Sequence, residues 1–283
     1  MSESLKTSLF TVLPTLGMLR ASKKYMDGLG CTFGLSSVNA KQQEFLAFFA
    51  SKIDESNLPE INSMADEDIS KVNEWIKQQG FDIQLGDNAG PGFAVAAIMR
   101  LILNWKEEGT DSSIGNWRAA KLSKGYSLSH NAEFHNHPVI RINCKNGDVA
   151  CMSIWGQPLD SNEKFLLAVS KLRNVKEPIF VDTVKFPCIS LDTQEDYDWI
   201  KGLRAGSGFR ITECKSQTKL KIDEFGAVVE SCSAVFMYRG GRFGKNYVID
   251  KPFLFWVERK GVSLPLFAAF LCEDVWVVKT GNG

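Results

Sequence analysis

The sequence predicts an α+β domain in which N-terminal helices pack on mostly antiparallel β-sheets. In the first part of the chain, apolar residues recur at helical spacing. In the later part, short alternating segments are separated by turn residues. We see no repeat, low-complexity tract or linker, so we expect a single domain over residues 1–283, helical over about 1–110 and sheet-rich over about 111–283.

Composition narrows the possible partners. The chain has 283 residues, of which 44% are hydrophobic and 23% charged, as in ordinary globular proteins. Lys plus Arg and Asp plus Glu both number 33, and no basic cluster stands out, so we expect no nucleic acid and no membrane as partner. No apolar run reaches the roughly 18 residues that a membrane span needs.

The first residues and the cysteines both favour a location inside the cell. The start, Met1–Lys6, is polar, and the apolar stretch Leu9–Pro14 is short for a secretory signal. We therefore expect a cytoplasmic protein, although a leader removed earlier would leave secretion open. The seven cysteines are odd in number and lack metal-type spacing, which favours reduced thiols.

Three helices are expected first. The first carries Leu9, Val12, Leu13, Leu16 and Leu19 and ends at Gly28–Gly30. The second is capped by Asn39 and runs over Ala40–Ile53, with Phe45, Phe48 and Phe49 in the core. The third opens at Asp66–Asp68, where acids suit the helix dipole, and ends at Gly80.

Strands are expected next. The segment 93–105 is almost wholly apolar, and a buried strand and a buried helix are both compatible with it. A hairpin is predicted over Val139–Cys144 and Val149–Trp155, with its turn at 145–148. A short helix is expected over Thr193–Leu203. Further strands are predicted over 180–184, 219–222, 253–258 and 264–271.

The C-terminal third resembles the serpin superfamily. Leu220–Gly226 is similar to the end of the serpin strand that leads into the reactive loop, and Val248–Trp256 to the strand that leaves it. The segment Val257–Leu271 resembles the closing strand pair of the family. Weaker similarities lie upstream, at Ser8–Thr11, Gly17–Leu19, Val72–Ile76, Trp105 and Phe186–Ser190. The chain thus looks like a shortened, divergent serpin-like protein.

Some features depart from the family pattern. The resemblance begins at the second helix of the family, and the stretch between Ile53 and Asp66 is too short for the usual helix and strand. Ser216 stands in place of a buried histidine, and Ala97 or a neighbour in place of a buried asparagine. Because those polar groups tie the opening sheet together in the family, their loss argues against insertion of the loop.

The resemblance implies an exposed reactive-centre-type loop at 227–247, preceded by a hinge that enters a sheet as a new strand. Side chains that enter a close-packed core must be small or apolar. A shift of one residue would bury Glu230 unpaired, at a cost of several kcal/mol. The residues assigned to the hinge are Glu224, Gly226, Ala227, Val229, Ser231 and Ser233, and the last four of them form the inward-facing set. The outward set is Val228, Glu230, Cys232 and Ala234.

The spacing of the family places the scissile bond within Tyr238, Arg239, Gly240, Gly241 and Arg242. Arginine in the specificity pocket implies a trypsin-like serine protease and tyrosine a chymotrypsin-like one, and a cysteine protease is also compatible. The competing interpretation is a solvated basic loop.

The expected function is therefore a monomeric protease inhibitor that acts once, as a suicide substrate, through a conformational change. The alternative is a non-inhibitory serpin-like protein that binds a partner or ligand through its scaffold. We expect no enzymatic activity, no cofactor and no metal site. His135 and His137 form a His-x-His pair with His130 nearby, but only Glu133 stands at a supporting spacing for zinc.

Overall fold

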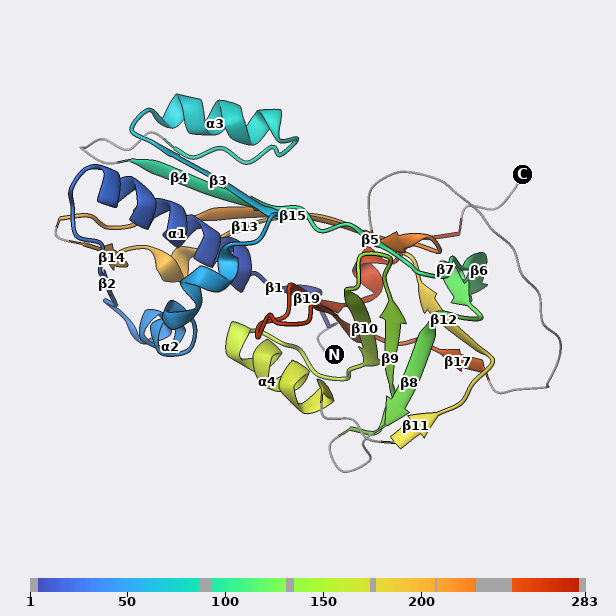
Figure 1. Cartoon of the computed structure of the whole chain (residues 1–283). Coiled ribbons are helices and arrows are strands. Elements are labelled where there is room, and N and C mark those ends of the chain that lie inside the picture. The colour runs from blue at the N-terminus through green and yellow to red at the C-terminus, as the bar shows by residue number, and fades with distance from the viewer. Residues whose placement is uncertain are drawn as a thin grey trace. The chain divides into compact units, whose positions relative to one another are not determined.

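A computed structural model gives the fold (Figure 1). It describes residues 5–86, 93–130, 135–173, 177–206, 208–227 and 246–279, without the side chain of Glu195. The chain divides into two compact units, whose segments interleave along the sequence. The first unit comprises Met1–Phe10, Leu101–Leu191 and Leu220–Gly283, and the second comprises Thr11–Arg100 and Asp192–Lys219. The single domain expected over 1–283 stays a prediction.

The three predicted helices form in the second unit, but Leu9, which was expected in the first of them, lies in strand β1 (Ser8–Phe10). The helices are α1 (Val12–Gly28), α2 (Ala40–Phe49), which continues as the 3-10 helix η1 (Ala50–Ser56), and α3 (Ile69–Gln78). Asn39 caps α2 by accepting a hydrogen bond from the Gln42 amide, and Asp68 caps α3 in the same way. The predicted burial of Phe48 is wrong, since its side chain is 53% exposed, whereas Phe45 and Phe49 are buried.

A two-stranded ribbon lies between two of these helices. It pairs β3 (Ile61–Asp66) with β4 (Ala94–Met99), and α1 and α3 cover its opposite faces (Figure 1). Ala94 and Ala96 pack against Val72 of α3. On the other face, a Cβ added to Gly17 of α1 would lie 2.7 Å from Ile61. The expectation that the stretch between Ile53 and Asp66 is too short for the usual helix and strand is therefore wrong as regards the strand, since β3 forms there.

The first unit contains a seven-stranded antiparallel sheet. Its order is β1-β19-β18-β10-β9-β8-β11, and the predicted 139–155 hairpin lies within it. Helix α4 (Asn162–Arg173) follows β10 in the chain and was not predicted. In sheet order the strands are Ser8–Phe10, Phe267–Leu271, Phe253–Glu258, Val149–Ile154, Val139–Asn143, Tyr126–His130 and Glu177–Ile179.

A second sheet of the first unit has the order β17-β12-β7-β6. Its strands are Asn246–Val248, Thr183–Pro187, Trp117–Leu122 and Thr110–Ile114. The outer pair β17 and β12 is parallel, and the other pairs are antiparallel. The strand expected at 180–184 begins a few residues later and ends at Pro187, and the amide of Cys188 still donates to the Arg118 carbonyl of β7 at 2.8 Å.

A third sheet has the order β13-β15-β16-β5. Its strands are Ile189–Asp196, Lys215–Ile222, Gly226–Ala227 and Leu103–Asn104. The segment 93–105 thus forms strands rather than a helix. The helix predicted over Thr193–Leu203 is wrong, because β13 extends to Asp196 and only the single 3-10 turn η2 (Asp198–Ile200) follows. The remaining elements are the short pair β2 (Leu35–Ser36) and β14 (Arg204–Ala205) and the 3-10 turn η3 (Glu273–Val275).

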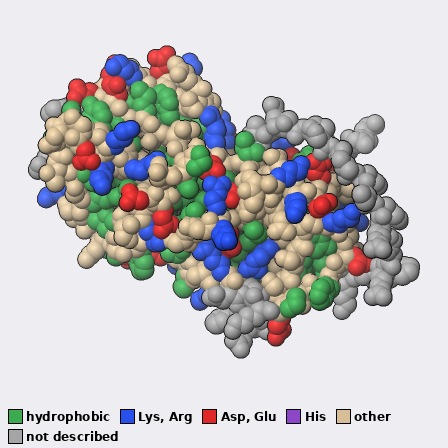
Figure 2. Space-filling view, in the orientation of Figure 1, with side chains coloured by type: hydrophobic (Ala, Val, Ile, Leu, Met, Phe, Trp, Pro, Cys, Tyr) green, Lys and Arg blue, Asp and Glu red, His purple; other side chains and the backbone are tan. Residues whose placement is uncertain are grey.

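One face of the molecule carries charges of both signs. On the face drawn in Figure 2, basic and acidic side chains are interspersed and hydrophobic ones are scattered among them. Among the described residues, no helix is long and apolar enough to cross a membrane.

Candidate functional site

Two residues of the predicted hinge, Gly226 and Ala227, lie in a sheet. Strand β16 is hydrogen-bonded on both sides: Ala227 pairs with Ile222 of β15 and with Leu103 of β5, and Gly226 pairs with Asn104. Ala227 is buried, as expected for the first member of an inward-facing set. Gly226 and Ala227 therefore form a central strand of this sheet.

The turn before β16 is fixed by its backbone. The Asp223 carbonyl accepts a hydrogen bond from the Trp105 indole at 3.0 Å, and the Phe225 carbonyl accepts one from the Trp105 amide at 3.0 Å. The Glu224 carbonyl accepts from the Gly109 amide at 2.8 Å, and the Gly226 carbonyl from the Asp223 amide at 2.9 Å. Four successive carbonyls are therefore satisfied, which holds this turn in one conformation.

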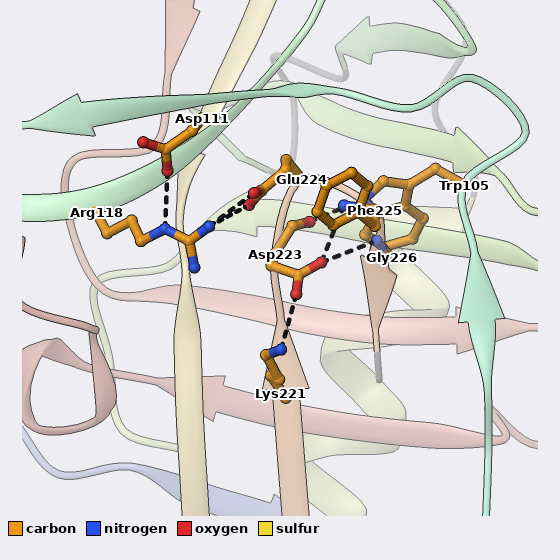
Figure 3. A network of polar contacts seen from close by, with 8 residues as sticks. All are labelled: Trp105, Asp111, Arg118, Lys221, Asp223, Glu224, Phe225 and Gly226. Atoms are coloured by element: carbon orange, nitrogen blue, oxygen red, sulfur yellow. Dashed lines mark hydrogen bonds and ion pairs between the residues drawn. The ribbon is translucent and has the colours of Figure 1, made fainter. Parts of the chain in front are cut away.

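An ionic network anchors the same turn (Figure 3). Nη2 of Arg118, on β7, donates to both carboxylate oxygens of Glu224, at 2.6 and 2.9 Å, while Nε donates to Asp111 at 2.7 Å. Glu224 is 5% exposed. The Asp111 hydrogen bond, together with the charge of Glu224, raises the pKa of Arg118.

The carboxylate of Asp223 completes the network. It accepts hydrogen bonds from the Phe225 and Gly226 amides at 2.9 and 3.3 Å and forms an ion pair with Lys221 at 3.1 Å (Figure 3). This is an Asx-type turn, in which a side chain caps the amides that follow it. It directs the chain from β15 back into β16.

Position 226 must be glycine because the neighbouring strand leaves no room for a side chain. A Cβ built on it would lie 2.0 Å from the Leu103 carbonyl oxygen, which belongs to the neighbouring strand and cannot give way cheaply. The close approach of two backbones explains glycine at the start of the hinge.

The other end of the predicted loop is anchored in the second sheet. Asn246, Tyr247 and Val248 of β17 pair in parallel with β12, and the Thr183 hydroxyl donates to the Asn246 side chain at 2.6 Å. Ile249 follows and is fully buried. Eighteen residues, 228–245, therefore connect two fixed anchors in different sheets.

The structure places only part of the predicted site. Glu224, Gly226 and Ala227 lie together in the turn described above. The other predicted hinge and bait residues lie outside the described residues; they are Val229, Ser231, Ser233, Tyr238, Arg239, Gly240, Gly241 and Arg242. Sequence reasoning missed Arg118, whose link to Glu224 joins residues 106 positions apart, and no local motif signals it.

Two strand edges near the hinge are unoccupied by any described strand. Of the described strands, only β3 pairs with β4, along one edge of it. Strand β15 pairs with β13 on one side, and on the other side only its last residue, Ile222, pairs with β16. Each of β4 and β15 thus has an edge that is unpaired, or paired at one residue only, among the described strands.

The described histidines and cysteines form no metal centre: among the described residues, no group of three or more His, Cys, Asp or Glu could hold an ion. The His135 ring stacks on Trp155, with 5.0 Å between centroids, and its Nε2 lies 2.6 Å from the Ile154 carbonyl oxygen. Burial lowers the pKa of His135.

Burial also raises the pKa of four thiols to about 12, which makes them poor nucleophiles: Cys144, Cys188, Cys214 and Cys272.

Comparison with solved structures identifies this architecture. A serpin from the trematode Schistosoma haematobium is similar at 14% identity, covering 95% of this chain and 94% of that one, with a TM-score of 0.53. Thyroxine-binding globulin in complex with thyroxine is similar at 13% identity over 95% and 92% of the two chains, also at 0.53. The human form of that globulin gives 12% identity over 91% and 98%, at 0.50. No family model and no curated protein matches the sequence.

The chain therefore has a serpin-like fold. The α+β class predicted from the sequence, with N-terminal helices on mostly antiparallel sheets, is confirmed, and so is the serpin resemblance at the level of the fold.

Proposed function

We propose that this protein is a protease inhibitor of the serpin type, which acts as a suicide substrate through residues 227–247. The observation that carries the proposal is the position of β16. The hinge begins as a strand between β15 and β5, and the edges beyond it, on β15 and β4, have no described strand partner. A cleaved loop has a place to continue the pairing that Gly226 and Ala227 begin.

The alternation of the hinge side chains supports this proposal. If the antiparallel pairing of β16 continued beyond Ala227, Val229 would lie between Leu101 and Leu220. Val229, Ser231 and Ser233 alternate with Ala227 in the sequence, so in such a strand they would share its face, and Ala227 is buried. The inward set is small or apolar, as close packing requires.

The proposed reaction begins as ordinary proteolysis. The nucleophile of the protease attacks a carbonyl carbon within 238–242, an acyl bond forms as the peptide bond breaks, and the leaving amine takes up a proton. The freed hinge then inserts, and the energy comes from the added strand. Hydrolysis of the acyl bond becomes slow because the active site of the attached protease is distorted. The chain itself catalyses nothing in this scheme and needs no cofactor.

Incubation with trypsin-like and chymotrypsin-like proteases tests the proposal. We expect an SDS-stable complex at the summed mass of the chain and the protease, and no complex with the same protease lacking its catalytic serine. Mass spectrometry of the released C-terminal fragment identifies the scissile bond. Clean cleavage within 238–242 without a complex would contradict the inhibitory function.

A second candidate is a non-inhibitory protein that binds a ligand or partner through its scaffold. Thyroxine-binding globulin, a structural neighbour, is described in complex with thyroxine. Ala97, on β4, has no polar side-chain group that could form a hydrogen bond across the sheet, as the buried asparagine expected from the family would. In this case loop cleavage should leave the melting temperature unchanged, because no strand inserts.

A further inference from the structure

Three segments of the second unit lie side by side and bring two arginines together. Strand β14 pairs with β2 through Arg204 and Ser36 (Figure 1). On its other side, Arg204 faces Arg210 across an antiparallel bridge. Ser36, Arg204 and Arg210 therefore occupy neighbouring positions in one row that crosses the three segments.

The register places the two arginines as close as an antiparallel pair allows. Backbone hydrogen bonds flank Arg204 and Arg210 on both sides, so the two form a non-hydrogen-bonded pair, in which the Cα atoms are about 4.5 Å apart. These bonds run from the Ala205 amide to the Phe209 carbonyl at 3.1 Å and from the Ile211 amide to the Leu203 carbonyl at 2.9 Å. Directly opposite residues of such a pair project to the same side of the ribbon.

Burial shows which side this is. Leu203 is fully buried and Ala205 is 5% exposed, whereas Arg204 between them is exposed. Because successive side chains of a strand point to opposite faces, Arg204 and its opposite residue Arg210 both project into solvent. Ser36, the next residue in the row, is exposed as well.

No carboxylate in the described part of the chain pairs with either arginine. Arg204 and Arg210 form no side-chain hydrogen bond or ion pair there, whereas the nearby Lys201 has its own carboxylate, Asp198, at 2.5 Å. Like charges directly opposite each other destabilise a strand pair. An anion that binds both guanidinium groups would remove this repulsion.

We propose that Arg204 and Arg210 form a binding site for a phosphate dianion, with the Ser36 hydroxyl as a third donor. A guanidinium group presents a planar fork of N–H donors that binds phosphate oxygens in pairs. Two such cations match the charge of a phosphate monoester, which is close to −2 at neutral pH. Because the register already holds both side chains on one face, the ligand does not have to order the backbone to bring them together.

Inorganic phosphate and a phosphorylated serine of another protein share this chemistry. The site uses no residue of the predicted hinge or bait, so the inference is independent of the proposed inhibition. Its failure and the failure of the inhibitor proposal are therefore separate results.

Titration calorimetry with phenyl phosphate and phenyl sulfate, at pH 7.5 and low ionic strength, tests the site. The two probes have nearly the same shape, but the sulfate ester carries a single charge, so we expect phenyl phosphate to bind at least about tenfold more tightly. Arg204→Gln and Arg210→Gln should each weaken phenyl phosphate binding by at least about tenfold, because each removes charge-assisted hydrogen bonds. Arg204→Lys keeps the charge but loses the fork, and its loss of affinity should lie between those of the wild type and Arg204→Gln.

Lys24→Gln is the matched control. Lys24 is an exposed cation on α1 of the same unit, so this variant lowers the net charge by the same amount as Arg204→Gln. It should change the affinity less than about twofold. Equal losses in Lys24→Gln and Arg204→Gln, or equal affinities for the two probes, would overturn the site.

Two further titrations distinguish the sources of the phosphate. A capped pentapeptide with a central phosphoserine is compared with inorganic phosphate and with the same peptide unphosphorylated. Tighter binding of the phosphopeptide would indicate a phosphorylated protein segment, and tighter binding of inorganic phosphate would indicate the free ion. Equal binding of the two peptides, or no binding of any of the phosphate probes, would overturn the proposal.

Discussion

The ion pair between Arg118 and Glu224 should be the main side-chain anchor of the hinge. Replacing Arg118 by alanine leaves a carboxylate that is only 7% exposed in its side chain without its cation. Breaking a fully buried pair costs roughly 3–5 kcal/mol. Because the Arg118 side chain is 35% exposed and water reaches the pair, we expect about 2–3 kcal/mol for Arg118→Ala.

Thermal unfolding of the intact protein, followed by circular dichroism at fixed ionic strength, measures this cost. For a chain of this size it corresponds to a fall in melting temperature of about 5–10 °C. Asp111→Asn is the control, since it removes the other partner of the same guanidinium at a site that is 56% exposed. We expect that variant to cost at most about 1 kcal/mol.

A second substitution separates the ion pair from the packing of the arginine stem. In Arg118→Ala/Glu224→Gln the buried charge is gone, so this double variant should be more stable than Arg118→Ala alone, by about 1 kcal/mol. The reasoning is refuted if Arg118→Ala and Asp111→Asn cost the same, or if the double variant is the least stable of the set.

Three further outcomes follow from the structure. Gly226→Ala places a Cβ 2.0 Å from the Leu103 carbonyl oxygen and should lower the free energy of unfolding by at least about 2 kcal/mol. The control Gly156→Ala, with open space around it, should lower it by less than about 1 kcal/mol. Equal melting temperatures of the two variants would argue against close packing at β16. Burial lowers the pKa of His135 below its usual 6.5, so the unfolded chain binds more protons as pH falls through 6.5. The free energy of unfolding should therefore decrease from pH 7.5 to 5.5, less steeply in His135→Phe, and an unchanged slope in that variant would contradict this assignment. In the native protein at pH 8, an alkylating reagent should label Cys31 before the five buried described cysteines, as peptide mapping would show, and equal labelling rates would contradict their burial.

The helices were predictable because their signals are local. Asn39 and Asp68 are caps that can be identified from the sequence, and the apolar spacing of α1 and α3 needs no tertiary information. Helix α4 carried a comparable signal, with Ser161 before it and buried residues at helical spacing, Phe165, Ala168, Val169 and Leu172. It went unpredicted because the later half of the chain was interpreted mainly as strands.

The errors occurred where tertiary contacts override local preference. Thr193–Leu203 has helix-compatible residues, yet its first part extends β13 because a neighbouring strand, β15, supplies backbone hydrogen bonds. The segment 93–105 could not be assigned by periodicity, since both of its faces are covered: in β4, Ala96 packs with the α3 cluster and Ala97 lies near Gly17 of α1. Phe48 fits a helical stripe, but the fold leaves it uncovered.

The sequence by itself determined the helix positions, the main hairpin, the two anchors around residues 228–245 and the small alternating set of the hinge, because each depends on neighbours in the chain. Only the tertiary structure decided that β16 lies between β15 and β5, that Arg118 meets Glu224, and that Arg100 and Lys219 share the Phe81 ring. The pairing of β16 with β5, the ion pair of Arg118 with Glu224 and the contact of Lys219 with Phe81 each join residues more than a hundred positions apart, and no local pattern encodes which distant partner a charge or a strand edge will meet.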